Sequence, residues 1–482
     1  MTPHLPTLTL GDGDLSLATD LYQLTMAAAY HAAAEEGAGM PTATFELWVR
    51  RLPPHRNFLV FAGLEQALAS LRALRFGGGQ IDWLRGLPPF RGVAASFFDR
   101  LAGFHFRGDV RAMAEGTVFF PDEPVLAVHA ELIEAQLVET LLLSIVNFQT
   151  AIASKAARVR LAADAGGETG PVGGRYQPGG GARVAEFGSR RAHGPQAALW
   201  AARAAVVGGA DATSNVAAGF HAGIPLVGTM AHSFVMAHER EEDAFRRYQS
   251  TFPQHTILLV DTYDTLEGVR LALATGGPFD GVRLDSGDLG ALSRDTRRLL
   301  DEGGRPDATI FASGDMNEHK IAALRAAGAP VDAFGVGTQL ATSADAPYLN
   351  GIYKLVEVER GGEARPTFKA SAGKATYPGP KQVVRETARR DGAEVMVGDR
   401  LLRHADEGRF PAALRLLAPV MAGGGPVGPL PDVAAARRRC LAELARLPAA
   451  LRSLDVAGDG YPVAVDPGLE TLLEEQRRKV LG

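Results

Sequence analysis

The most regular feature of the chain is an alternation of short apolar runs with longer amphipathic segments, which starts at residue 183. Helical patterns separate the runs, and strand–helix alternation of this kind predicts a parallel sheet. The fairly even spacing favours a closed or nearly closed α/β barrel over an open doubly wound sheet. The seven runs are RVAEF, DATS, IPLVG, TILLVD, FDGVRLD, TIFASGD and VDAFGVG.

The segments on either side follow different patterns. Thr19 and Asp20 are placed to cap a helix through LYQLTMAAAYHAAAEEG, and ATFELWVR (43–50) alternates as a strand does. The stretch from 131 has the 3.6-residue apolar spacing of one long or broken helix. After residue 357 the alternation becomes hairpin-like, with turn residues between. We therefore predict an N-terminal α+β domain (1–130), a barrel (131–357) and a C-terminal segment (358–482).

Composition excludes several classes of protein. The 482 residues have a net charge of −5 and no long basic run, so a nucleic acid or an anionic membrane is not an expected partner. A single cysteine, Cys440, excludes a disulfide framework and argues against a thiolate metal site. The start of the chain lacks the pattern of a secretory signal, and the apolar stretch 141–146 is too short to cross a bilayer. We expect a cytoplasmic protein.

Polar residues cluster where the predicted strands end. In α/β barrels the chemistry lies at the carboxyl ends of the strands. Asp and Ser at such places also serve as helix caps and turns, but His232 and Arg283 have no capping role. The set therefore predicts a catalytic opening, which we call the mouth of the barrel. Its members are Glu186, Thr229, His232, Asp261, Arg283, Asp285, Ser286, Ser313, Asp315 and Thr338.

Several turns at the mouth favour a phosphorylated substrate. SGD occurs at 286–288 and again at 313–315, each time between a strand and a helix, and 335–338 offers a third turn of this kind. Arg190 and Arg191 directly follow a strand, where guanidinium groups suit a carboxylate or phosphate; a surface pair bridging acidic neighbours is the alternative. The Gly-rich stretch 166–181 lacks the Gly-Lys-Ser/Thr of a phosphate loop, so we expect a flexible surface loop.

Longer motifs narrow the reading further. In chain order they are TDLYQLTM (19–26), EFGSRRAHGPQ (186–196), GTMAHSF (228–234), VDTYDT (260–265), GVRLDSGDL (281–289), FGVGT (334–338), NGIYKLVE (350–357) and KATYPGPKQVVR (374–385). With these motifs the chain resembles nicotinate phosphoribosyltransferase, a type II phosphoribosyltransferase. The resemblance implies an α/β fold: an irregular or incomplete α/β barrel with an α+β domain built from the N-terminal and C-terminal parts, the C-terminal segment packing on the N-terminal domain.

The resemblance also implies an activity. Such enzymes join nicotinate to 5-phosphoribosyl 1-pyrophosphate in NAD salvage, releasing pyrophosphate and nicotinate mononucleotide. ATP hydrolysis is coupled through a phosphorylated histidine, which His232 matches, and Mg²⁺ is expected on the pyrophosphate and on ATP. Tyr22 matches an aromatic residue that stacks on the pyridine ring from a neighbouring subunit, so a homodimer with shared active sites is implied.

Roles follow for the other matching residues. His232 and Asp285 are the expected catalytic pair, and no metal ligand is named. No role is assigned to the 166–181 loop, and Lys369, Lys374 and Lys381 stay open between phosphate contacts and ordinary surface positions. The residues expected to bind nicotinate are Tyr22, Arg190, Arg191, Thr229 and Arg283. Those expected to bind the phosphoribosyl donor are Asp261, Ser286, Ser313, Gly314, Gly337 and Thr338.

The sequence leaves three alternative enzyme functions. A nicotinamide enzyme of this fold carries an acidic residue directly after Gly-Thr, where this chain has the apolar Met230, which favours a carboxylate substrate. A quinolinate enzyme works without ATP coupling and would leave His232 unexplained. A sugar-phosphate barrel isomerase or lyase is the third alternative; a Schiff-base lyase requires a lysine on a barrel strand, and none of the seven runs contains one.

Overall fold

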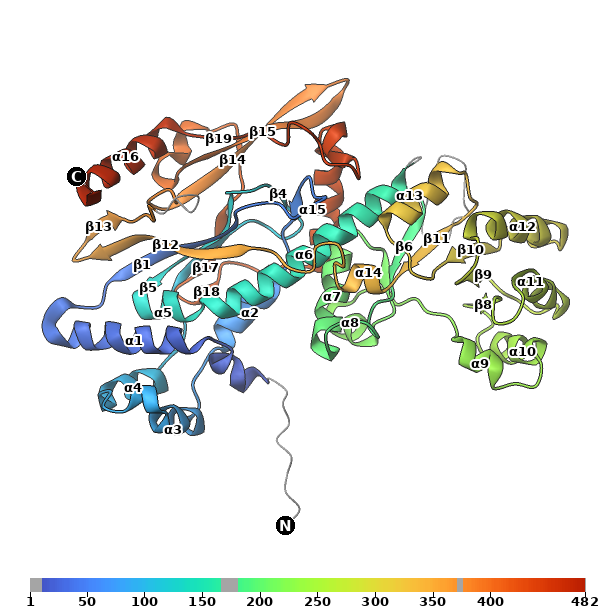
Figure 1. Ribbon diagram of the computed structural model, residues 1–482, viewed down its shortest axis with the longest axis horizontal. Helices are drawn as coiled ribbons and strands as arrows, with labels where there is room; N and C mark the ends of the chain where they lie inside the picture. Colours follow the sequence, from blue (N-terminus) through green and yellow to red (C-terminus); the bar gives the residue numbers. More distant parts are fainter. Residues whose placement is uncertain (1–10, 166–180, 371–375, 482) are drawn as a thin grey trace, which may run out of the picture.

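The computed structural model describes residues 11–165, 181–370 and 376–481. Figure 1 shows two regions, one that combines both ends of the chain and one that contains the alternating strands and helices. Helix α6 (Glu139–Asp164) extends from the first region toward the second. Among the described residues, none of the helices combines the length and the apolar character that crossing a bilayer requires.

The first region is built on a seven-stranded sheet whose strands come from both ends of the chain. Its order is β13-β12-β1-β5-β3-β17-β18, and every neighbouring pair is antiparallel. An α+β unit made from both chain ends is the arrangement that the resemblance implied. The predicted domain boundary at residue 357 falls within β12. The strands are β1 (Thr42–Val49), β3 (Asp109–Ala112), β5 (Pro124–Glu131), β12 (Gly351–Arg360), β13 (Glu363–Pro366), β17 (Ala418–Ala422) and β18 (Gly425–Pro426).

Helices and two smaller sheets complete this region. A four-stranded sheet has the order β16-β14-β15-β19, and β2 pairs with β4. These strands are β2 (Leu59–Val60), β4 (Val118–Phe119), β14 (Lys381–Arg390), β15 (Ala393–Arg403), β16 (Leu414–Arg415) and β19 (Val463–Val465). The helices are α1 (Leu21–Ala33), α2 (Leu64–Ala73), α3 (Gly78–Gly86), α4 (Ala95–Ala102), α5 (Leu132–Leu137), α15 (Val433–Arg446) and α16 (Pro467–Leu481).

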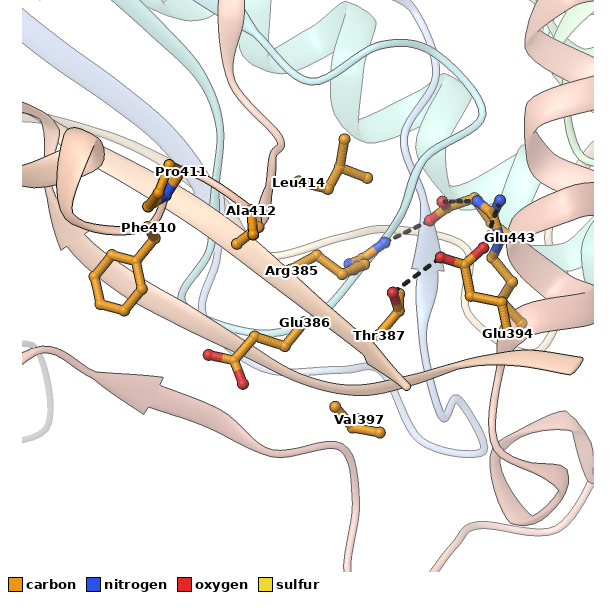
Figure 2. Close-up of a pocket in the computed structure, with 12 residues that line it drawn as sticks. Arg385, Glu386, Thr387, Glu394, Val397, Phe410, Pro411, Ala412, Leu414 and Glu443 are labelled. Carbon is orange, nitrogen blue, oxygen red and sulfur yellow. Dashed lines mark hydrogen bonds and ion pairs between the residues drawn. The ribbon is translucent and has the colours of Figure 1, made fainter. Parts of the chain in front are cut away.

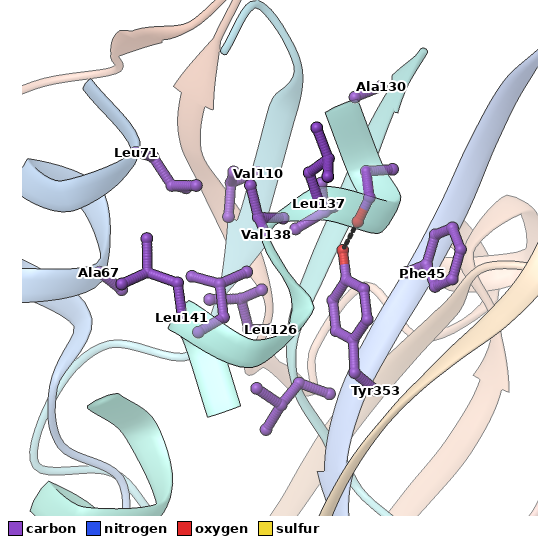
Figure 3. Close-up of a cluster of buried hydrophobic side chains, with 14 of the residues drawn as sticks. Phe45, Ala67, Leu71, Val110, Leu126, Ala130, Leu137, Val138, Leu141 and Tyr353 are labelled. Carbon is purple, nitrogen blue, oxygen red and sulfur yellow. Dashed lines mark hydrogen bonds between the residues drawn. The ribbon is translucent and has the colours of Figure 1, made fainter. Parts of the chain in front are cut away.

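Tyr353 of β12 connects the sheet to the helices that cover it (Figure 3). Its ring stacks on Phe45 of β1 with the centroids 4.9 Å apart, and its hydroxyl donates a 2.8 Å hydrogen bond to the carbonyl oxygen of Ala135 in α5. The surrounding side chains are apolar and buried, Leu126 and Val138 among them. A buried tyrosine needs a partner for its hydroxyl, so this bond fixes α5 against the sheet.

The second region contains a curled, fully parallel sheet with the order β7-β6-β11-β10-β9-β8. The two end strands, β7 and β8, do not pair with each other, so the barrel is incomplete, as the resemblance implied. The strands are β6 (Arg183–Glu186), β7 (Ala212–Thr213), β8 (Ile257–Leu259), β9 (Gly281–Leu284), β10 (Thr309–Ala312) and β11 (Ala333–Val336). The helices are α7 (Pro195–Val207), α8 (Val216–Ala222), α9 (His232–Met236), α10 (Glu241–Thr251), α11 (Thr265–Ala274), α12 (Leu289–Glu302), α13 (Glu318–Ala326) and α14 (Thr338–Ala341).

One predicted strand, IPLVG, does not form. It makes a single parallel bridge between Leu226 and Thr213 at the open edge beside β7. Proline has no backbone N–H to donate to the hydrogen bonds of a β-sheet. Pro225 therefore contributes only its carbonyl oxygen, which accepts a hydrogen bond from the Thr213 N–H at 3.0 Å. The prediction of a seventh strand was wrong for this reason, and the barrel stays open at this point.

The hydroxyl of Tyr353 provides a test of this packing. Tyr353→Phe keeps the ring stack but leaves the Ala135 carbonyl without its partner, so we expect the free energy of unfolding to fall by about 1 kcal/mol. Urea denaturation followed by circular dichroism measures the change. Tyr348→Phe, at a residue that is 69% exposed, is the matched control and should leave the midpoint unchanged. Equal midpoints for the two variants would contradict the assignment.

Candidate active site

Arg283 lies at the centre of the mouth and connects three loops. Its Nε donates to Ser313 Oγ at 2.8 Å, and one terminal nitrogen donates to Thr229 Oγ1 at 3.0 Å. The other terminal nitrogen forms a 2.6 Å ion pair with Asp285 Oδ1. The guanidinium also lies 5.9 Å from the centre of the Phe187 ring. A cation held on several sides in this way has a fixed position.

Asp285 belongs to a chain of polar contacts that orders the loop after β9. Ser313 donates to its Oδ1 at 2.5 Å, and its own backbone N–H donates to Asp261 Oδ2 at 2.9 Å. The Ser286 hydroxyl donates to the same Asp261 oxygen at 2.8 Å. Burial acts to raise the pKa of Asp285, but the Ser313 hydrogen bond and the Arg283 charge outweigh it, so the pKa lies below its usual value. Asp285 is therefore a stable anion in the mouth.

His232 is the first residue of α9 and stands beside Asp285. Its Nε2 lies 3.8 Å from Asp285 Oδ2, and its Nδ1 lies 3.2 Å from Thr262 Oγ1. The imidazole is 41% exposed. A histidine whose Nδ1 carries the proton and donates it to Thr262 presents the lone pair of Nε2 to the mouth.

A cavity of about 270 Å³ lies within the mouth. Gly314 sits at its edge with φ +87°, and a Cβ there would lie 1.8 Å from the carbonyl oxygen of Asp285, so only glycine fits between the loops after β9 and β10. The lining residues are Phe187, Arg190, Arg191, Arg283, Asp285, Ser313, Gly314, Asp315, Gly335, Gly337 and Thr338. Eight of the predicted site residues are therefore together in one cavity. Thr229, His232 and Asp261 contact lining residues, and Ser286 bonds to Asp261.

Phe187 is the functional candidate that the sequence reading missed. Its ring stacks on Phe311 of β10 with centroids 5.4 Å apart, beneath Arg283. Gly335 makes this possible, since a Cβ there would lie 2.7 Å from the Phe187 ring. Glu186 precedes Phe187 in the sequence and is buried. Its carboxylate accepts hydrogen bonds from the Thr213 hydroxyl, at 2.6 Å, and from the backbone N–H of Gly188. The sequence did contain a signal for Phe187, because this aromatic residue directly follows a predicted strand within the motif EFGSRR.

Other predicted residues lie outside this cavity. Tyr22, at the start of α1, does not line the mouth of its own chain and is 48% exposed. Lys381 forms a 2.8 Å ion pair with buried Glu46 and donates to two carbonyl groups, so it is a structural residue. The backbone N–H of Lys369 donates to Thr376 at 3.1 Å. Residues 166–180 of the predicted 166–181 loop, and Lys374, fall outside the described residues.

A second cavity, of about 680 Å³, lies on the β14–β15 hairpin (Figure 2). It contains none of the predicted site residues. Arg385 at its edge is buried and ion-paired with Asp399 and Glu443, and it donates to the Val118 carbonyl oxygen at 2.8 Å. Burial acts to lower the pKa of Arg385, but these carboxylates outweigh it and raise it. The cluster holds the hairpin and α15 on β4, which is a structural role.

Comparison with known proteins agrees with this architecture. Two family models match: the nicotinate phosphoribosyltransferase N-terminal domain over residues 17–147, and the nicotinate phosphoribosyltransferase family over residues 182–391. Nicotinate phosphoribosyltransferase pncB2 of Mycobacterium tuberculosis is 45% identical over 457 residues, which cover 93% of this chain and 91% of the relative. The Bacillus subtilis nicotinate phosphoribosyltransferase is 44% identical over 383 residues, covering 78% of this chain and 74% of the relative.

The crystal structure of human nicotinic acid phosphoribosyltransferase superposes with a TM-score of 0.78 at 28% identity, covering 95% of this chain and 99% of the human one. The curled parallel barrel and the α+β unit from both chain ends thus define a type II phosphoribosyltransferase fold. The chain belongs to the nicotinate phosphoribosyltransferase family. It is an enzyme, and the resemblance drawn from the sequence motifs is confirmed.

The close approach at Gly314 predicts a sensitive position. Gly314→Ala should displace Asp285 and lower kcat/KM roughly a hundredfold, because the loops after β9 and β10 must separate to make room for the added Cβ. Gly304→Ala is the matched control: Gly304 has φ +72° but open space around its Cβ position. Gly304→Ala introduces the same positive-φ strain but no steric clash with another residue, so this variant should retain activity. Steady-state kinetics on both variants measures the difference, and circular dichroism checks that both fold. Equal activity of the two variants would contradict the requirement for glycine at position 314.

Proposed function

We propose that the chain converts nicotinate, 5-phosphoribosyl 1-pyrophosphate and ATP to nicotinate mononucleotide, pyrophosphate, ADP and phosphate, as a cytoplasmic homodimer in NAD salvage. The observation that carries this proposal is the position of Arg283, a fixed cation beside the Phe187 ring in a cavity lined by phosphate-binding turns. A flat anionic ring and a phosphorylated sugar are the ligands that such a cavity suits.

Nicotinate fits the Arg283 side of the cavity. Its carboxylate would bind the guanidinium and the Thr229 hydroxyl, and its ring would lie against Phe187. Met230, which is 5% exposed, offers no carboxylate to accept a carboxamide N–H, and this supports nicotinate over nicotinamide. Arg190 and Arg191 line the same cavity and add positive charge for the carboxylate or for the phosphates of the donor.

The donor fits the turns after β10 and β11. Backbone N–H groups near Gly314, Gly337 and Thr338 suit its phosphates, and Asp285 suits the ribose hydroxyls. The nicotinate nitrogen attacks the anomeric carbon as the bond to pyrophosphate breaks, so the protein supplies positioning and stabilises the positive charge that develops on the ribose. Asp285, whose pKa is lowered by the Ser313 hydrogen bond and the Arg283 charge, is the group that would do this.

His232 is proposed as the phosphorylated residue. Its Nε2 lone pair attacks the γ-phosphorus of ATP, the bond to the bridging oxygen breaks, and ADP leaves with that electron pair. Water later releases phosphate from the phosphoramidate. Thr262 holds the opposite ring nitrogen, and Asp285 at 3.8 Å balances the positive charge on the ring.

Mg²⁺ is expected with the pyrophosphate and ATP, and Asp261 fits a role in holding it. Asp261 is 9% exposed, and its Oδ1 has no hydrogen-bond partner among the described residues. No group of three or more metal-ligating side chains is gathered in the described parts of the chain, which suits an ion held mainly by phosphates and water. The ion would neutralise the charge on the leaving pyrophosphate.

The homodimer is supported by where apolar side chains are exposed. Leu21 and Tyr22 begin α1 with about half of their surface exposed, at 49% and 48%. Val216 and Phe220 on α8 are 71% and 84% exposed. Exposed apolar residues of this size are typical of an interface between subunits. A partner's α1 at the mouth would supply the Tyr22 ring that the cavity lacks in its own chain.

The direct test is a product assay with nicotinate, nicotinamide and quinolinate in parallel, each with and without ATP. We expect nicotinate mononucleotide from nicotinate only, formed faster with ATP, and an acid-labile, base-stable phosphoryl adduct on the protein. His232→Asn should abolish the adduct and the ATPase activity but retain slow, ATP-independent synthesis, because the nucleophile at carbon is nicotinate. His238→Asn is the control and should keep the adduct. An adduct that persists in His232→Asn would refute the role of His232.

The shared site is tested by mixing two impaired proteins, Tyr22→Ala and Arg283→Ala. In a mixed dimer, the subunit with Tyr22→Ala keeps an intact barrel and receives Tyr22 from its partner. We expect recovery of about one quarter of wild-type activity, because random exchange makes about half of the dimers mixed and each has one complete site. Subunit exchange is verified by mass spectrometry of differently tagged chains. Verified exchange without recovery would place Tyr22 in its own subunit's site or outside any site.

A further inference from the structure

A cavity of about 600 Å³ lies at the end of the barrel opposite the mouth. We call it the amino-end cavity, because the first residues of five of the six parallel strands line it. Among the described residues, none lines both this cavity and the cavity in the mouth. The five strand residues are Arg183, Ala212, Ile257, Thr309 and Ala333.

A stacked aromatic pair stands between the two cavities. A Cβ on Gly335 would meet the rings of both Phe187 and Phe311, so these positions face the interior of the barrel. Side chains alternate along a strand, so Ala333 and Thr309 face the same interior two residues earlier. Phe311 lines the amino-end cavity and Phe187 lines the mouth. The amino-end cavity is therefore a separate space in the same barrel.

Small side chains and an unformed strand leave this end of the barrel hollow. Barrel interiors are usually filled by bulky branched side chains, but here Ala185, Ala212 and Ala333 line the space. Another wall is the segment 223–227, which makes only one isolated bridge to β7. Leu226 in this segment is 53% exposed, so solvent reaches this wall. The result is a largely apolar cavity at the free edge of the sheet.

Both acidic residues that line the cavity already have partners. Asp211 accepts from Arg160 at 3.1 Å and forms an ion pair with Arg437, the lining residue from α15. Asp332 accepts from the backbone N–H of Ile310 at 2.6 Å. These carboxylates hold the surrounding elements together.

The two remaining basic side chains of the lining are Arg183 and His255. Arg183 is partly buried and His255 is exposed. Neither side chain makes an ion pair or hydrogen bond in the part of the chain that the structure describes. A guanidinium beside apolar side chains suits a carboxylate, which it can bind through two parallel hydrogen bonds. The charge that the cavity offers to a ligand is therefore positive.

We propose that the amino-end cavity binds a small apolar carboxylate, with the carboxylate on Arg183 and the hydrocarbon part between the alanines and Phe311. Its volume of about 600 Å³, against about 270 Å³ in the mouth, admits a ligand larger than nicotinate. The site uses none of the residues assigned to nicotinate, the phosphoribosyl donor or phosphoryl transfer, so it is independent of the proposed reaction.

The charge arm of the test uses full-length protein and isothermal titration with 2-naphthoate, an aromatic carboxylate of two rings. We expect the wild-type protein to bind it. Arg183→Gln should raise the Kd roughly tenfold, because one charge-assisted interaction is lost. Arg438→Gln, at an exposed arginine outside the cavity, is the matched control and should leave the Kd unchanged.

The space arm compares two exposed alanines of α15. Ala434 lines the cavity and Ala445 does not. Ala434→Trp places an indole in the space of the ligand and should weaken 2-naphthoate binding at least tenfold, whereas Ala445→Trp should not change it. Thermal unfolding of each variant checks that the fold is kept.

The mouth is tested as the competing site with Arg283→Ala, which should keep the binding that Arg183→Gln weakens. Loss of binding in Arg283→Ala with an unchanged Kd in Arg183→Gln would place 2-naphthoate in the mouth and overturn the proposal. Absence of binding by the wild-type protein, or equal Kd values for Ala434→Trp and Ala445→Trp, would also overturn it. None of these results depends on the proposed enzymatic reaction, which the product assay tests separately.

Discussion

The ion pair between Arg283 and Asp285 is the interaction on which the arrangement of the mouth depends. One guanidinium donates to Asp285, to Ser313 and to Thr229, which come from the loops after β9 and β10 and from the segment before α9. Loss of any one partner would free the cation to turn toward the others. A backbone hydrogen bond from the Ser313 N–H to the Leu284 carbonyl oxygen, at 2.8 Å, joins the ends of β9 and β10, and the Arg283 network links the loops beyond it.

Buried carboxylates support the same loops from the sheet side. Asp261, after β8, accepts from the backbone N–H of Asp285 and from the Ser286 hydroxyl, so it orders the loop of the neighbouring strand. Glu186, at the end of β6, accepts from Thr213 and from the Gly188 N–H. Burial raises the pKa of Glu186, which these hydrogen bonds partly offset. Each of the two carboxylates thus accepts a hydrogen bond from one backbone N–H at the mouth, which holds the loops in place.

The seven-stranded sheet combines strands from both ends of the chain, and this arrangement is connected with the incomplete barrel. Strand β12 follows the barrel in sequence but pairs with β1, so the chain returns to its beginning before it ends. Arg385, paired with Asp399 and Glu443, then fixes the C-terminal hairpin and α15 to that unit. The parallel sheet therefore keeps an open edge at β7.

The sequence by itself determined the alternation of strands and helices, the family, and most of the residues at the mouth, because strand ends and motifs are local features of the chain. It did not determine that IPLVG would form one isolated β-bridge and no strand, since this depends on how that segment pairs with its neighbour β7. It also missed Phe187, whose role follows from the space that Gly335 leaves across the barrel. The tertiary structure decided these points because contacts between loops, and gaps between helices, depend on how distant segments pack against one another.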